Sequence, residues 1–294
     1  MEQKRSRWTL DAIMRVCTWL RLHTQGGMSR LLRRLHIHWK RGRDSIHSPD
    51  ADYVAKLKDV QICLQRVWLP VADTVLLFED ELTYYRQPTI AHAYDEAGRE
   101  QPRAQRSYRK NTSFRIAAAV DAFIGQAHYV QRNKISVDVL VSLYEQICHA
   151  YPTGRTIYIA QDNWPVHFHP DVLAALQPQR FPWPLHVPPN WPKEASPKAR
   201  RLNLPIQLLP LPTYAPWTNP VEKLWRWLKQ DVLHLHRYAD RWDELKRLIA
   251  TFLDGFAHGS PDLLRYVGLT ASSRQYGDAI AGRLGPPRLV GLNC

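Results

Sequence analysis

Cysteine is scarce in this sequence, long apolar runs are absent, and acidic residues are outnumbered by basic ones. No two of the 4 cysteines among its 294 residues form a CxxC pair, which excludes a zinc ribbon and gives no disulfide framework. They are Cys17, Cys63, Cys148 and Cys294. No segment reaches the roughly 18 uninterrupted apolar residues of a membrane-spanning helix, and the opening MEQKRSRW lacks the apolar centre of a signal peptide. Free thiols suit a reducing compartment, so we expect a cytoplasmic protein with no membrane partner.

Positive charge is what the chain has in excess. It carries 40 Lys and Arg against 27 Asp and Glu, a formal net charge of +13. Residues 1–50 hold 11 of the basic and 4 of the acidic residues, so more than half of the excess lies in about a sixth of the chain. A generally basic surface would spread this charge evenly. The asymmetry favours a nucleic-acid partner instead, because Lys and Arg release counterions when they neutralise phosphates.

The basic N-terminal segment has the outline of a helix-turn-helix. Apolar spacing predicts a helix over residues 9–20 with Thr9 as its N-cap, a break at Gly26 and Gly27, and a second helix over 28–35. Such a pattern is typical of DNA-binding units, and an amphipathic hairpin with a solvated basic face is the alternative. The candidate DNA-binding residues are Arg30, Arg33, Arg34, Lys40, Arg41 and Arg43.

The rest of the chain is predicted to be α/β. A helix over 50–67, with Val54, Leu57, Val60 and Leu64 on one stripe, forms a connector through residue 70. Apolar runs then predict strands at 75–78, 89–94, 114–123, 127–132, 156–160 and 206–209, and helices at 136–150, 170–176, 220–235 and 241–256. Several strands in a row, followed by alternating helix and strand, indicate a mixed sheet flanked by helices.

Residues 177–205 break this pattern because they contain 8 prolines. Proline removes backbone donors, so the segment is predicted to be a long surface loop or arm. Trp183 and Trp191 give it two alternatives: packing on a partner, or packing back on its own domain. The tail, residues 258–294, has no pattern that assigns a role.

Three acidic residues stand where a carboxylate is useful to a metal. Asp80 ends the apolar run VLLFED, Asp162 ends TIYIAQD, and Glu222 lies in the first turn of the helix predicted at 220–235. Each has an ordinary alternative: a turn residue for Asp80, an Asx turn for Asp162, and a capping box behind Asn219 for Glu222. Because side chains alternate along a strand, both neighbours of Asp80 are predicted to face away from it. These neighbours are Glu79 and Glu81.

Three sequence blocks carry a family resemblance. The run TYAPWTNPVEKLWRWLK, residues 213–229, resembles the signature of mariner-type DDE transposases, in particular the bacterial insertion sequence 630 family. QDNWPVH, residues 161–167, resembles the Asp-Asn-x-x-x-His block of that family, and FEDE, residues 78–81, resembles its first acidic block. The resemblance covers roughly residues 71–256. It extends weakly to the N-terminal helices, which look like the second half of a paired helix-turn-helix region.

The resemblance implies an RNase H-like catalytic domain over residues 71–257. In it Asp80, Asp162 and Glu222 would bind two Mg²⁺, with Mn²⁺ as a substitute, and catalyse cleavage and strand transfer of transposon DNA. Supporting roles would fall to Asn163, His167 and Asn219. The implied partners are double-stranded DNA, as transposon ends and target, and a second copy of the chain in a homodimer. When bound to DNA, the protein would associate with the nucleoid.

Two departures from the family pattern keep alternatives open. Between Asp162 and Glu222 lie 59 residues, more than is usual in the family, and we interpret residues 177–205 as an insertion. Residues 1–49 have room for only one of the family's two helix-turn-helix units, which predicts either a truncated reading frame or a misplaced start codon. The alternatives to an active transposase are a truncated or domesticated DNA-binding relative and an RNase H-like nuclease.

Overall fold

The computed structural model describes residues 8–39, 48–68, 73–98, 100–152, 155–185 and 187–269. The chain forms two compact units, Met1–Ser45 and Ile46–Cys294, which are treated separately below. Three predicted DNA-binding residues, Lys40, Arg41 and Arg43, lie outside the described residues, as does the tail from residue 270. No helix among the described residues is long and apolar enough to cross a membrane.

The N-terminal unit contains two capped helices, α1 (Leu10–Val16) and α2 (Gln25–Arg34), with a 3₁₀ turn, η1 (Thr18–Leu20), between them. The Thr9 hydroxyl accepts a hydrogen bond from the Ala12 N–H, as the sequence predicted for this N-cap. Met28 is fully buried in the unit. Arg30, Arg33 and Arg34 lie on α2 and are exposed, which leaves their charges available to a partner.

Two predictions about this unit were wrong. The first helix does not run to residue 20, because Cys17 leaves the helical conformation and Arg21 adopts a left-handed one with φ of 50°. Gly26 and Gly27 do not break the chain but lie in the first turn of α2. Thr24 precedes them and its hydroxyl accepts from the Gly27 N–H at 3.1 Å, so a side-chain cap offsets the weak helix propensity of glycine.

The second unit is built on a five-stranded mixed sheet in the order β3-β2-β1-β4-β5. The strands are β1 (Thr74–Tyr85), β2 (Ser113–Asp121), β3 (Ala127–Arg132), β4 (Thr156–Gln161) and β5 (Ile206–Pro210). Pairing is antiparallel among the first three strands and parallel from β1 through β4 to β5. This is the predicted mixed sheet, with the long β1 at its centre.

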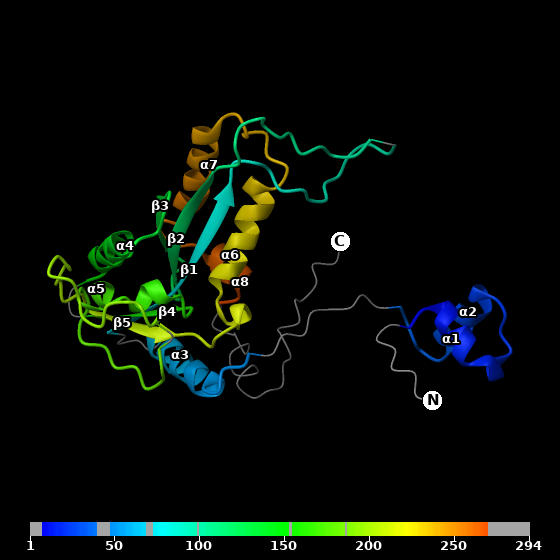
Figure 1. Ribbon diagram of the computed structural model, residues 1–294, viewed down its shortest axis with the longest axis horizontal. Coiled ribbons are helices and arrows are strands. Elements are labelled where there is room, and N and C mark those ends of the chain that lie inside the picture. The colour runs from blue at the N-terminus through cyan, green and yellow to red at the C-terminus, as the bar shows by residue number, and fades with distance from the viewer. Residues whose placement is uncertain are drawn as a thin grey trace. The chain divides into compact units, whose positions relative to one another are not determined.

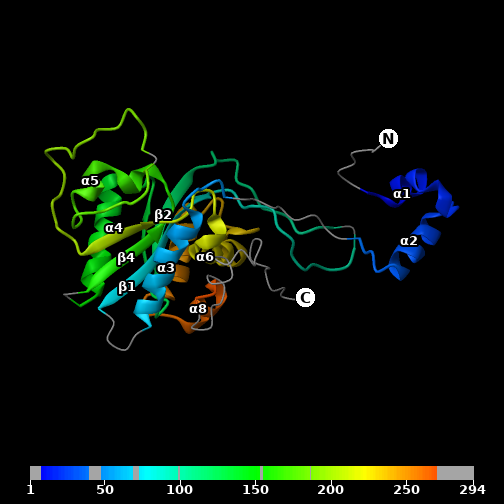
Figure 2. The same cartoon turned by 90° about the horizontal axis from the view of Figure 1, so that it is seen from below.

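Helices cover both faces of the sheet (Figures 1 and 2). On one face, α4 (Val137–Ala150) and α5 (Pro170–Leu173) pack against alternate residues of the strands, including Val75 and Leu77 of β1. The other face carries Leu76 and Phe78 and is covered by α3 (Tyr53–Val67), α6 (Val221–Leu228), α7 (Trp242–Asp254) and α8 (Pro261–Val267). The two-residue alternation of β1 therefore divides its side chains between two separate cores.

Strand β1 is longer than the apolar run that predicted it, and this corrects the placement of Asp80. The strand continues through the acids to Tyr85, because Leu82 and Tyr84 resume the buried alternation and β2 pairs with β1 from Leu77 to Tyr85. Asp80 is therefore inside a strand and not at its end. However, the parallel neighbour β4 pairs only as far as Phe78, so the sheet is open on that side beside Asp80.

Three further helix and strand predictions need correction. The strand predicted at 89–94 is absent, and only Thr89 forms an isolated bridge, with His234. The described residues between β1 and β2 instead form a long projecting loop (Figure 1). On α3, Val54 is 44% exposed, and the buried stripe consists of Lys56, Leu57, Val60, Cys63 and Val67. Helix α6 ends at Leu228 and continues as one π-helical turn, Lys229–Leu233.

The proline-rich segment forms no helix or strand among its described residues, as predicted, and it packs back on its own unit. Trp191 contacts the His169 ring at 5.0 Å between centroids, and Arg200 pairs with Glu145 of α4 at 2.8 Å. Gln179 Oε1 accepts a hydrogen bond at 3.0 Å from the Leu208 N–H of the outer strand β5, so this backbone donor at the edge of the sheet is not left unpaired.

The catalytic domain was predicted to end at residue 257, but α8 lies beyond that limit and packs in the same core.

Candidate active site

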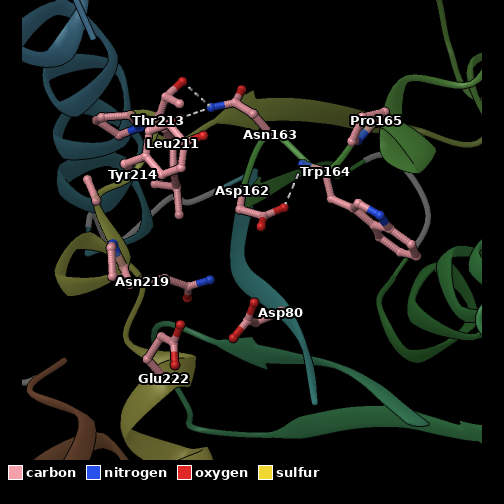
Figure 3. Close-up of a pocket in the computed structure, with 13 residues that line it drawn as sticks. Asp80, Asp162, Asn163, Trp164, Pro165, Leu211, Thr213, Tyr214, Asn219 and Glu222 are labelled. Atoms are coloured by element: carbon pink, nitrogen blue, oxygen red, sulfur yellow. Dashed lines mark hydrogen bonds between the residues drawn. The ribbon is translucent and has the colours of Figure 1, made fainter. Parts of the chain in front are cut away.

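One pocket is lined by all three acidic residues singled out in the sequence. It has a volume of about 520 Å³. In Figure 3 the carboxylates of Asp80, Asp162 and Glu222 point toward a shared space, from β1, the end of β4 and the first turn of α6 respectively. The other lining residues come mainly from two loops, and they are Asn163, Trp164, Pro165, Leu211, Pro212, Thr213, Tyr214, Ala215, Pro216 and Asn219.

Asp80 is held by a buried indole. Its Oδ2 accepts a hydrogen bond from Trp225 Nε1 at 2.8 Å, and Trp225 is only 1% exposed in the core beneath the pocket. Burial raises the pKa of Asp80 to about 8, and the charges of Glu222, Glu81 and Asp162 contribute in the same direction. Sequence analysis missed the role of Trp225, although its place three residues after Glu222 puts both on one face of α6.

Asp162 both forms a turn and faces the pocket. Its Oδ1 accepts a hydrogen bond from the Trp164 N–H at 2.8 Å, so the alternative Asx turn is present and still leaves the second oxygen free. The side chain is 57% exposed. Burial acts to raise the pKa of Asp162, but the contact with His167 and the Trp164 N–H outweigh it and lower the pKa. Asp162 is thus the acid of the three that is most readily ionised.

Glu222 does not form the capping box that its local sequence suggested. The Asn219 N–H, which such a glutamate would accept from, donates to the Pro216 carbonyl at 3.1 Å instead. Asn219 does cap α6, since its Oδ1 accepts from the Val221 N–H at 3.1 Å. Burial raises the pKa of Glu222, with Asp162 adding to the shift and Lys229 opposing it. The Glu222 carboxylate is left facing the pocket.

Two of the three residues expected to support the acids, Asn163 and Asn219, donate hydrogen bonds to backbone carbonyls. The Asn219 amide donates to the Glu79 carbonyl at 2.8 Å, which ties the start of α6 to β1 beside Asp80. The Asn163 amide donates to the Leu211 carbonyl at 2.7 Å and to Thr213 Oγ1 at 3.1 Å, joining the loops after β4 and β5 (Figure 3). His167 is fully buried and is not among the described residues that line the pocket.

Residues at the start of α3 hold Thr213, which lies in the pocket-lining loop after β5, through contacts that sequence analysis did not anticipate. Asp50 Oδ2 accepts from the Thr213 N–H at 2.8 Å, and Ser48 Oγ donates to the Thr213 carbonyl at 2.6 Å. Lys56 pairs with the same Asp50 oxygen at 2.8 Å, and the two side chains are only 5% and 6% exposed. Ser48, Asp50 and Lys56 thus connect α3 to one wall of the pocket.

The donor set of the pocket suits hard divalent cations. It offers three carboxylates, and none of its described lining residues is basic. Crowded carboxylates repel one another, and burial and this repulsion together raise the pKa of Asp80. A cation removes that repulsion, and oxygen-rich sites of this kind favour Mg²⁺ and Mn²⁺. The residues present therefore fit a divalent metal.

Strand order, helical layers and the placement of the acids together define an RNase H-like transposase fold. Residues 75–246 match the family model described as DDE superfamily endonuclease, and the chain belongs to this family.

Known proteins similar to this chain point the same way. The insertion element IS630 uncharacterized 39 kDa protein of Shigella sonnei is 23% identical over 248 residues, which are 83% of this chain and 64% of that protein. Crystal structures of Mos1 share the fold. The Mos1 mariner paired end complex with Mn has a TM-score of 0.60 at 16% identity, over 96% of this chain and 80% of that one. The Mos1 strand transfer complex has a TM-score of 0.57 at 14% identity, over 96% and 81%.

Proposed function

We propose that this protein is a transposase that cleaves and joins DNA through Asp80, Asp162 and Glu222. The observation that carries the proposal is the pocket, where these three acids of the matched segment, distant in sequence, meet. They would hold two Mg²⁺, with Mn²⁺ as a substitute. Bound there, the ions would supply activation of the attacking hydroxyl and stabilisation of the leaving oxygen in phosphodiester transfer.

The chain's own residues would orient these acids before any ion binds. Trp225 holds one oxygen of Asp80, and the Trp164 N–H holds one oxygen of Asp162. The Asn219 bond to β1 sets the distance from α6 to Asp80. Preorganisation of this kind lowers the reorganisation needed at the moment of reaction.

DNA would be the substrate and partner. The described residues of the N-terminal unit expose Arg30, Arg33 and Arg34 on α2, and the chain carries a net charge of +13. The Mos1 transposase forms a paired-end complex with the left transposon end, and we extend that substrate class to this chain. Two ends held together would require a homodimer.

We expect the purified chain to nick supercoiled DNA in Mg²⁺ or Mn²⁺ and to stop when EDTA is added, because the carboxylates alone cannot activate a phosphodiester. Gel electrophoresis of plasmids carrying the ends of its own element measures both nicking and strand transfer. Binding without nicking would support the truncated or domesticated relative instead. Nicking without any joined product would support the RNase H-like nuclease.

Replacing Arg30, Arg33 and Arg34 with glutamine should weaken DNA binding and flatten its salt dependence. Each arginine that no longer neutralises a phosphate reduces the slope of log affinity against log salt by about 1. Fluorescence anisotropy at several salt concentrations measures this slope. As a matched control, Arg265→Gln removes one exposed positive charge from α8 and should leave the slope unchanged. A change in slope for Arg265→Gln equal to one third of that for the triple variant would show that only net charge matters.

A further inference from the structure

A second cluster of ionisable groups lies on the opposite face of β1 from the pocket. Glu79 and Glu81 point away from Asp80, as their alternation predicted, and meet His167 from the 3₁₀ turn η2 (Pro165–Phe168). One ligand atom from each of the three lies within 4.8 Å of the other two. His167 Nε2 is 3.5 Å from Glu79 Oε2 and 3.5 Å from Glu81 Oε1.

The groups of this cluster are buried and lack hydrogen bonds. Both carboxylate oxygens of Glu79, one oxygen of Glu81 and both ring nitrogens of His167 are buried without a hydrogen-bond partner. Glu79 and His167 are 0% exposed. Within the described part of the chain, His167 is the sole basic side chain that comes within 4.0 Å of either glutamate. Buried polar atoms rarely remain unsatisfied, and each is costly if it does.

The spacing between the imidazole and the two carboxylates suits a shared metal ion better than a direct hydrogen bond between them. A nitrogen and an oxygen 3.5 Å apart are too distant for a good hydrogen bond. Around a tetrahedral ion, bonds of about 2.0–2.2 Å place neighbouring ligand atoms about 3.3–3.6 Å apart. One ion between the three side chains would therefore satisfy His167 Nε2 and one oxygen of each glutamate.

We propose that Glu79, Glu81 and His167 bind one divalent cation of the borderline class, such as Zn²⁺, at a site separate from the catalytic pocket. The imidazole selects this class, because Zn²⁺ and other transition metals accept mixed nitrogen and oxygen ligands. Mg²⁺ prefers an octahedral shell in which it keeps several waters, and two fully buried ligands do not offer that. Glu81, with its side chain 18% exposed, provides the path for entry.

The ion would act as a structural link between β1 and the turn after β4. These two segments carry Asp80 and Asp162, and His167 Nε2 also lies 3.5 Å from Asp162 Oδ1. Nearby, the buried Tyr144 hydroxyl donates to Gln161 Oε1 at 2.9 Å, while Gln161 Nε2 has no partner. That amide is available to orient a ligand carboxylate, as groups outside the coordination shell commonly do.

The test uses Co²⁺ as a probe, because tetrahedral Co²⁺ absorbs visible light far more strongly than octahedral Co²⁺. The full chain is stripped with a chelator and titrated with Co²⁺. We expect one strongly absorbing equivalent that Zn²⁺ displaces and that millimolar Mg²⁺ does not. The band should persist in the double variant Asp80→Asn/Glu222→Gln and disappear in Glu79→Gln. The surface change Glu244→Gln on α7 serves as the matched control and should leave the band unchanged.

Two results would overturn the proposal: no tetrahedral band in the unaltered protein, or a band that survives Glu79→Gln and is lost in the Asp80→Asn/Glu222→Gln variant. If Glu79→Gln fails to fold, the Asp80→Asn/Glu222→Gln variant tests the proposal by itself. One tightly bound, strongly absorbing Co²⁺ in that variant supports the second site, and the absence of this Co²⁺ band contradicts it. Because the readout is spectroscopic, the outcome is independent of whether the chain cleaves DNA.

Discussion

Asp162→Ala should lower the rate of metal-dependent DNA cleavage by about a thousandfold, which corresponds to about 4 kcal/mol of lost transition-state stabilisation. Asp162 is the pocket acid with the lowered pKa, so it offers a charged ligand at neutral pH. Its side chain is 57% exposed, and its removal should cost little stability. Single-turnover cleavage at saturating Mg²⁺ measures the change.

Three comparisons make the result specific. Asp162→Asn keeps an oxygen that can accept from Trp164 and should be nearly as inactive, because the loss lies in the charge and not in the turn. Asp243→Ala removes an exposed acid from α7 and should cleave normally. DNA affinity should stay within about twofold, since neutralisation of phosphates by basic residues sets it. Cleavage within tenfold of the unaltered protein would refute the assignment of Asp162.

Asp50→Asn should destabilise the second unit, which contains the five-stranded sheet, by about 3 kcal/mol. The change leaves the Lys56 ammonium buried without its partner, and an uncompensated buried charge is strongly destabilising. The carboxylate also accepts from the Thr213 N–H, so the pocket wall should loosen as well. Chemical denaturation monitored by tryptophan fluorescence measures the free energy of unfolding.

Removing the charges of both Asp50 and Lys56 tests whether the unpaired lysine causes the loss of stability. The double variant Asp50→Asn/Lys56→Met should recover much of the loss, because no unpaired charge remains. The exposed pair Arg265 and Asp262 gives the control, since Asp262→Asn should cost less than about 0.5 kcal/mol. A similar loss in the single and double variants would show that the Thr213 contact, and not the ion pair, is responsible.

The effect of Asp50 should also depend on pH. Burial acts to raise the pKa of Asp50, but hydrogen bonds from Lys56, Thr213 and Asp52 outweigh it and lower the pKa below its ordinary value of 3.8. A carboxyl with a depressed folded-state pKa stabilises the fold above its unfolded-state pKa. That stabilisation disappears as the pH falls through the folded-state pKa. The difference between the unaltered protein and Asp50→Asn should therefore be full at pH 7 and shrink below pH 4.

Periodicity and apolar runs predicted most of the sheet and its helices, but not the extent of β1. The run Glu79–Glu81 looks like the end of a strand, since three acids in a row rarely enter a sheet interior. The strand continues because β2 pairs with it from Leu77 through the acids to Tyr85, and pairing with a distant segment leaves no local mark. For the same reason, residues 89–94 have a local strand pattern and form no strand, since no neighbour pairs with them beyond Thr89.

The candidate site was also predicted only in part from local sequence. The sequence blocks around Asp162 and Glu222 singled out both acids, although the local sequence favoured a helix cap for Glu222 and offered an Asx turn as the alternative for Asp162. The hydrogen bonds that hold the site come from elsewhere: Trp225 to Asp80, Asn219 to the β1 backbone and Asp50 to Thr213. The last of these joins residues 163 positions apart, which only the folded chain brings together.

The alternation of β1 side chains between the two faces of the sheet also limits where residues can be inserted or deleted. Deleting or inserting one residue before Asp80 would rotate the acids to the opposite faces of the sheet and exchange Asp80 with a glutamate. Length changes should instead be tolerated in segments outside the strands, such as 86–112 and 177–205. We therefore expect natural variants of this protein to differ in length in those two segments, while the number of residues from Thr74 to Glu81 stays constant.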